Sequence, residues 1–342
     1  MSAQSQLKGA AFEWFVRNYL ISCGFKQVKT DNFLIYKGGP GLMVHGLGQP
    51  HNADVLLSPP IQIPFYYPAR LLVECKGYNK EVQLPVIRNA LGLREDINRF
   101  DIVTPDILRK RRNYRRRTNA LYDCRRYLYQ VGVASIKGFG KPAQEFAATH
   151  RIPLISFENH PSFQLLNNLM SYINDIVLNK LEVRALIKCF QDNQVLEFRI
   201  NDEEKYSVFN EFVISSNKLF RNALIGILDT GDIIFIHNHN RDTFFNQRAQ
   251  QTNINIHWSS ESKYWMIKPQ EIGEWKLTFE LPEQLFNEWS ETNYDRAEAI
   301  NMKENNFSNI YLFAVKNGRF WFHILKLSQA FLDNARRGLV RK

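Results

Sequence analysis

The sequence contains few cysteines, and none of them stands in a motif. The 342 residues include four, Cys23, Cys75, Cys124 and Cys189, which are widely scattered and form no CxxC pair. This absence excludes a disulfide framework and a zinc knuckle as the basis of the fold. It also favours a reducing compartment, and we expect the protein to be cytoplasmic.

Long hydrophobic runs are absent as well. No apolar stretch approaches the roughly 18 residues that span a bilayer, and the N-terminal MSAQSQLKGA lacks the basic and then apolar layout of a signal peptide. We therefore expect no membrane partner. Hydrophobic residues make up 44% of the chain and charged residues 23%. These values exclude disorder, collagen and coiled coil as descriptions of the whole chain.

Acidic residues are scarce in the first half only. Residues 1–160 contain 23 Lys and Arg against 12 Asp and Glu, whereas the remaining residues contain 21 against 22. The net charge of +10 therefore comes from the first half. A basic half joined to a neutral one is typical of a protein whose basic half binds a polyanion, most often nucleic acid. A solvated basic face would have the same composition.

The first 160 residues predict an α/β domain. Apolar residues recur at helical spacing in some segments and form short strand-like runs in others, with glycine and proline between them. The expected elements are a helix over 7–21, strands over 32–37, 53–57 and 70–75, a helix over 85–100, a strand over 129–135, a helix over 142–150 and a strand over 152–157. In this order, helices can cover a central mixed sheet.

The second half of the sequence contains mostly short strand-like runs. An apolar helical stretch within 161–181 is expected to connect the halves, and residues 182–342 predict a β-rich α+β accessory domain. Its expected strands cover 184–190, 195–200, 223–228, 232–237, 276–281, 310–315 and 320–325. Target recognition and dimerisation are the two roles that we consider for it. Its five tryptophans are expected to pack in a core, with a pocket for a flipped base as the alternative.

Three charged residues in the first half predict one site. Side chains two apart on a strand point to the same face, so Glu74 and Lys76 are neighbours there, while Cys75 points the opposite way. If Asp54 lies on the adjacent antiparallel strand, two carboxylates and an ammonium meet. This set suits Mg²⁺, which is bound through one or two carboxylates and several waters. The alternative for Glu74 and Lys76 is a surface salt bridge, but Leu71–Val73 make their strand look buried.

These residues resemble the signature of the PD-(D/E)XK nuclease superfamily, with Asp54 as the first acid and Glu74-Cys75-Lys76 as the ExK element. Two further segments are similar to its Mrr-like restriction endonuclease branch. Residues 9–25, GAAFEWFVRNYLISCGF, resemble the opening helix, and residues 131–157 resemble the closing strand, helix and strand. Ala53 departs from the proline that many members have before the first acid. This departure removes no metal ligand.

The resemblance implies a restriction-endonuclease-like core and an Mg²⁺-dependent DNA endonuclease, with Mn²⁺ as a substitute, that acts in restriction or defence against foreign DNA. Asp54, Glu74 and the Cys75 backbone carbonyl would hold the metal, and Lys76 would orient or help to deprotonate the attacking water. Double-stranded DNA and a second copy of the chain are the implied partners. The alternatives are a structure-specific or transposition-related nuclease with the same core, and a DNA-binding protein without turnover.

Other residues are candidates for supporting roles. The resemblance places Glu13 of the opening helix where it could support the metal, and a solvated helix position is the equal alternative. Gln49 and His51 lie just before Asp54 and are candidates for contacts to the metal-bound water or a phosphate, although such loop residues are more often solvated.

One stretch is strongly cationic. Residues 109–117 read RKRRNYRRR, with seven basic residues in nine. A cluster of this kind suits neutralisation of DNA phosphates, while a mobile basic loop is the alternative. The residues that we expect to bind DNA are Arg109, Lys110, Arg111, Arg112, Arg115, Arg116 and Arg117.

Overall fold

A computed structural model describes most of the chain. The described residues are 2–32, 34–39, 41–62, 66–100, 109, 126–158, 161–192, 203–239, 244–245, 250–259, 262–271, 275–316 and 319–340. Within these ranges, no helix is both long enough and apolar enough to cross a membrane.

The first half contains a five-stranded mixed sheet, as its pattern predicts. The strand order is β1-β5-β6-β7-β8. β5 pairs antiparallel with both β1 and β6, whereas β6, β7 and β8 are parallel. The strands are β1 (Lys26–Gln27), β5 (Val55–Ser58), β6 (Ala69–Lys76), β7 (Leu128–Ser135) and β8 (Leu154–Ser156).

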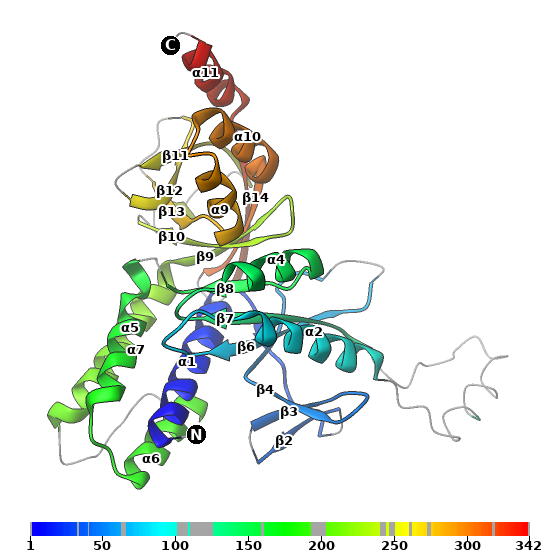
Figure 1. The fold of residues 1–342 in the computed structure, drawn as a ribbon, viewed down its shortest axis with the longest axis vertical. Coiled ribbons are helices and arrows are strands. Elements are labelled where there is room, and N and C mark those ends of the chain that lie inside the picture. The colour runs from blue at the N-terminus through cyan, green and yellow to red at the C-terminus, as the bar shows by residue number, and fades with distance from the viewer. Residues whose placement is uncertain are drawn as a thin grey trace.

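Helices cover both faces of this sheet (Figure 1), because its central strands are apolar on both sides. In β6, Leu71 and Val73 pack on the side of α1 (Ala3–Ser22), while Leu72 packs on the side of α2 (Leu84–Arg99) and α4 (Lys141–His150). The predicted helices over 7–21, 85–100 and 142–150 are thereby confirmed. The chain is a mixed α/β protein in this half.

Three further helices extend the layer on the α1 side. They are α5 (Gln164–Asp175), α6 (Lys180–Asp192) and α7 (Glu203–Asn222), which follow the short 3₁₀ helix η1 (Pro161–Phe163). Their apolar side chains share one core with α1. The strand predicted over 184–190 is therefore wrong. Val183, Leu186 and Phe190 are buried at helical spacing. The strand predicted over 195–200 lies outside the described residues.

A separate three-stranded sheet stands beside the main one. It consists of β2 (Ile35–Gly38), β3 (Gly41–His45) and β4 (Pro50–Ala53), paired as an antiparallel meander. The strand predicted over 32–37 belongs to this sheet and not to the central one. β4 ends at Ala53, directly before Asp54 and β5. The three-stranded sheet therefore fixes the segment that leads into the predicted site.

The second half forms a closed seven-stranded barrel, in the order β10-β13-β12-β11-β15-β14-β9. Five of its strands match the predicted runs, whereas the hairpin of β11 and β12 was not predicted. The strands are β9 (Ala223–Leu228), β10 (Ile233–Asn238), β11 (Gln251–Ser259), β12 (Ser262–Pro269), β13 (Leu277–Glu280), β14 (Asn309–Lys316) and β15 (Arg319–Leu327). In the part of the chain that the structure describes, α9 (Glu283–Glu291), α10 (Arg296–Phe307) and α11 (Gln329–Val340) accompany them.

The barrel interior is tightly packed. Trp265, Trp275 and Trp289 are buried in its core, which supports the core interpretation for them, whereas Trp258 is 36% exposed. A Cβ on Gly226 would lie 2.8 Å from a methyl carbon of Ile310, so this strand position has room only for glycine.

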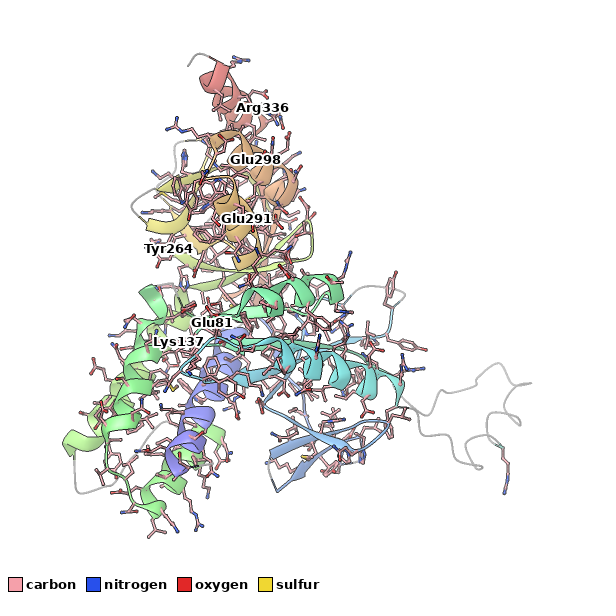
Figure 2. The ribbon with its side chains drawn as sticks, viewed as in Figure 1. Glu81, Lys137, Tyr264, Glu291, Glu298 and Arg336 are labelled. Atoms are coloured by element: carbon pink, nitrogen blue, oxygen red, sulfur yellow. The ribbon has the colours of Figure 1, made fainter. Side chains whose placement is uncertain are left out.

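Polar contacts between the two halves join α4 to α9. Lys141 Nζ lies 2.9 Å from Glu291 Oε1, and the Asn287 side-chain amide donates a hydrogen bond of 2.8 Å to Gln144 Oε1. Figure 2 shows Glu291 on the side of the barrel that faces α4.

Candidate active site

The three predicted residues meet at one edge of the central sheet. Asp54 immediately precedes β5, and Glu74 and Lys76 are the third-last and last residues of β6. The antiparallel register pairs Val55 with Val73, which brings the preceding Asp54 next to Glu74. The antiparallel neighbour that the predicted site requires is therefore confirmed.

A backbone hydrogen bond fixes Asp54. The Cys75 N–H donates to Asp54 Oδ2 over 2.8 Å, and the Asn52 side-chain amide lies 3.4 Å from Oδ1. The strong contact comes from the neighbouring strand, so the position of the carboxylate is tied to the sheet itself.

Glu74 and Lys76 form an ion pair. Lys76 Nζ lies 2.9 Å from Glu74 Oε2, and the side chains of Lys76 and Glu74 are 22% and 20% exposed. Burial lowers the pKa of Lys76, but the negative charge of Glu74, the hydrogen bond to it and Asp54 raise the pKa by more. Lys76 therefore carries a positive charge in this arrangement.

Cys75 points away from the pair, as the strand period predicts. It packs against the core on the α1 side, and burial raises the pKa of its thiol well above the ordinary value. The thiol therefore stays protonated and is neither a nucleophile nor a metal ligand. Only the peptide group of Cys75 is available to the site.

Glu13 of α1 interacts electrostatically with Asp54 and Glu74. Burial raises its pKa to about 8, and the charges of Asp54 and Glu74 add to this shift, while Arg17 acts in the opposite direction. Burial, followed by repulsion from Glu74, likewise raises the pKa of Asp54 to about 6, against the hydrogen bond from Cys75. Both shifts have the same meaning: negative charge is crowded here in a poorly solvated place.

Arg17 is a residue of this site that was not predicted from the sequence. It stands four residues after Glu13 on α1, and its guanidinium donates a hydrogen bond of 2.7 Å to the Phe190 carbonyl of α6. Burial lowers its pKa, and Glu13 is the first of the charges that oppose this effect. The acid-to-base spacing of four on a helix was the available signal.

The donor set fits a hard divalent cation. Carboxylate and carbonyl oxygens are the ligands that Mg²⁺ uses, with waters completing its shell. A cation would offset both the burial and the repulsion that raise the pKa of Asp54 and Glu13. Among the described residues, no group of three His, Cys, Asp or Glu side chains is arranged as a metal cage. Asp54 and Glu74 therefore offer two side-chain ligands, the number that is usual for Mg²⁺.

The loops after β6 and β7 lie side by side at the same edge. Val82 pairs with Phe139 in an isolated parallel bridge, and the Val82 N–H donates to the Gly138 carbonyl over 3.0 Å. Figure 2 shows Glu81 and Lys137 of these two loops near each other. The carboxyl ends of parallel strands form the usual ligand-binding edge of an open α/β sheet.

Gln49 and His51 are placed differently from the three carboxylates. The His51 Nε2 atom lies 2.6 Å from Asp96 Oδ2 near the end of α2, and the Gln49 carbonyl accepts a hydrogen bond from the Gly46 N–H over 3.2 Å. The bond from His51 lowers the pKa of Asp96. His51 thus joins the β3–β4 hairpin to α2, and the structure does not bring it to Asp54.

The cationic run lies almost entirely outside the described residues. Of its members, only Arg109 is described, and it is exposed; the others are Lys110, Arg111, Arg112, Arg115, Arg116 and Arg117. The elements on either side of the run are described by the structure. α2 ends at Arg99, and β7 begins opposite Ala69, the first residue of β6. Both flanking ends therefore lie at the opposite edge of the sheet from Lys76.

No family model matches this sequence. No curated protein matches it either. Among solved structures, the chain is similar to the crystal structure of AF1548, a protein of unknown function. The two sequences are 12% identical, the match covers 61% of this chain and 99% of the other, and the TM-score is 0.37. A likeness this distant carries no conclusion about fold or activity, so the function must be inferred from the site.

Proposed function

We propose that the protein is a metal-dependent DNA nuclease that hydrolyses phosphodiester bonds at the Asp54, Glu74 and Lys76 site. One observation carries this proposal. Two half-buried carboxylates, Asp54 just before β5 and Glu74 near the end of the antiparallel β6, meet at the carboxyl end of β6, with a paired lysine two residues beyond the second carboxylate. Partly buried charges of this kind require a reason, and metal binding is the one that their chemistry supports best.

The roles follow from the positions. Asp54 and Glu74 would hold the cation together with the Cys75 backbone carbonyl, and the Cys75 N–H would keep Asp54 in place. A bound Mg²⁺ would supply Lewis acidity to a phosphate oxygen and lower the pKa of a water. Lys76 is protonated beside Glu74, so its role is to hold the attacking water and to offset negative charge on the phosphate.

The rest of the first half supports a polyanionic substrate. Residues 1–160 carry the positive charge of the chain, and phosphate contacts by the cationic run would add affinity that falls with salt. Restriction or defence against foreign DNA, by two copies acting together on a duplex, is the biological role implied by the resemblance to the Mrr-like branch.

A DNA-binding protein without turnover is the competing function. It would explain the positive charge of the first half, but it gives no reason to keep two half-buried carboxylates side by side. The complete set of Asp54, Glu74 and Lys76 favours the nuclease.

Cleavage of supercoiled plasmid, methylated and unmethylated, tests the proposal. We expect nicked and linear products with Mg²⁺ or Mn²⁺, none with chelator, and little cleavage but intact binding with Ca²⁺. Asp54→Asn and Glu74→Gln should each lower the rate by at least about 100-fold. Metal-independent cleavage, or activity that survives both substitutions, would overturn the proposal.

A further inference from the structure

A cavity of about 530 Å³ begins one residue beyond Lys76. One wall is the loop that follows β6, residues 77–80, and the other consists of the first turns of α1 and Asn174 of α5. Its volume lies within the roughly 300–1,000 Å³ of ordinary ligand sites. The cavity therefore adjoins the proposed catalytic edge without including the carboxylates.

Two cations line this cavity, Lys8 from α1 and Lys80 from the loop. Lys8 is only 8% exposed, and its Nζ donates a hydrogen bond to Asn174 Oδ1. Burial lowers its pKa, which the charge of Asp175 partly opposes. An ammonium held by a neutral amide in a poorly solvated place gains from an anion in the cavity, because the anion would replace lost solvation.

An exposed aromatic ring lies in the same loop as Lys80. Tyr78 lines the cavity and is 51% exposed. It follows Lys76 by two residues, in the loop that leaves the proposed catalytic edge. An aromatic face beside lysines is the combination with which proteins bind single strands, since every base has a π-face that can stack.

We propose that this cavity holds one unpaired nucleotide next to the scissile phosphate, with its base against Tyr78 and its phosphate near Lys8 and Lys80. The inference rests on the proposed function for the position of that phosphate. Within an intact duplex both faces of an internal base are covered by its neighbours, so Tyr78 can stack on such a base only after it has left the stack. The preferred substrate is therefore DNA with an unpaired base at the cleavage point, such as a flap, gap or frayed end, and an intact duplex would have to unpair a base there before cleavage.

Binding without turnover tests this inference separately from the nuclease activity. The full-length protein is titrated, in chelator, against a fluorescein-labelled single-stranded oligonucleotide and against a blunt duplex of the same sequence, with anisotropy as the readout. The variant combines Tyr78→Ala with Lys80→Gln, two exposed positions, and its melting temperature checks the fold. The matched control combines Tyr66→Ala with Lys218→Gln, which remove an exposed tyrosine and an exposed lysine elsewhere.

We expect the variant to lose about tenfold in affinity for the single strand, less than twofold for the blunt duplex, and the control to match the wild type. Unchanged single-strand affinity, or an equal loss for both probes, would overturn the inference. The two proposals fail independently. A protein that binds single strands through Tyr78 but cleaves nothing with any metal keeps the cavity assignment and loses the nuclease. If the wild-type protein cleaves DNA and the variant binds the single strand normally, the nuclease proposal stands and the cavity assignment is overturned.

Discussion

The backbone amide of Cys75 lies 2.8 Å from Asp54 Oδ2 and donates a hydrogen bond to it. This bond joins the residue that precedes β5 to the end of β6, so the spacing of the two acidic positions is set by the sheet and not by a loop. A site on rigid strands keeps its geometry while substrate enters and leaves. The same residue offers its carbonyl to the proposed cation.

Replacing Glu13 tests the burial of its carboxyl group beside Asp54 and Glu74. The pKa of Glu13 is raised to about 8 from an ordinary value of 4.5, so the folded protein binds more protons than the unfolded chain between these pH values. Stability should therefore fall as pH rises through this window. In metal-free buffer at pH 8, Glu13→Gln should raise the melting temperature by roughly 2–4 °C, with little change near pH 4. A variant less stable than the wild type at pH 8 would contradict this expectation. It would show that neighbouring positive charges such as Arg17 stabilise the ionised Glu13 carboxylate.

The cationic run is expected to bind the DNA backbone without reading sequence. Replacing five arginines with alanine should weaken binding to all sequences alike and reduce the salt slope by about one unit for each phosphate that is no longer neutralised. The five are Arg111, Arg112, Arg115, Arg116 and Arg117. The matched control replaces five exposed cations of α6 and α7, namely Lys180, Arg184, Lys188, Lys218 and Arg221.

The measurement is the DNA affinity of each protein as a function of salt concentration, for two duplexes of unrelated sequence. A slope that stays at the wild-type value in the arginine variant, or that falls equally in the control, would mean that the run does not bind phosphate.

Local periodicity predicted the core of the site but not its surroundings. The alternation of β6 placed Glu74 and Lys76 on one face and Cys75 on the other, because side-chain direction in a strand depends on adjacent residues only. The burial of Glu13 and Arg17 depends on how α1 packs against helices much later in the chain, which no local pattern contains.

The same limit explains the errors in the second half. The run around Val183, Leu186 and Phe190 is apolar enough to fit a strand, and its helical period is visible only when the buried face is known. The barrel closes through the parallel pairing of β11 with β15 and the pairing of β9 with both β10 and β14. Closure depends on strands that are far apart in the chain, whereas the individual strands β9 and β10 were predictable from their own residues.

Lys303 gives a prediction for the stability of the barrel. Its ammonium lies 5.2 Å from the Trp265 ring centre and 5.6 Å from that of Phe331, and burial lowers its pKa to about 8. The unfolded chain therefore binds more protons between about pH 8 and the ordinary lysine value, so stability should rise with pH there. Because the cation–π contacts offset only part of the burial cost, Lys303→Met should raise the melting temperature at pH 7 by roughly 2–4 °C.

The matched substitution is Lys268→Met, at an exposed position of β12 in the same barrel. It should leave the melting temperature within about 1 °C of the wild type, since surface changes away from special contacts have small effects. Destabilisation by Lys303→Met would instead assign the ammonium a net favourable role over the two rings.

The central claim is that Lys76 acts in the chemical step and is not merely an ion-pair partner of Glu74. Single-turnover cleavage of plasmid DNA with Mg²⁺ tests it most directly, with wild type, Lys76→Met and the exposed-lysine control Lys218→Met compared at equal DNA occupancy. We predict that Lys76→Met lowers the cleavage rate by at least about 100-fold while the affinity for DNA in Ca²⁺ changes by less than about threefold, and that the control cleaves normally. A Lys76→Met protein that is folded and cleaves at the wild-type rate would contradict the account.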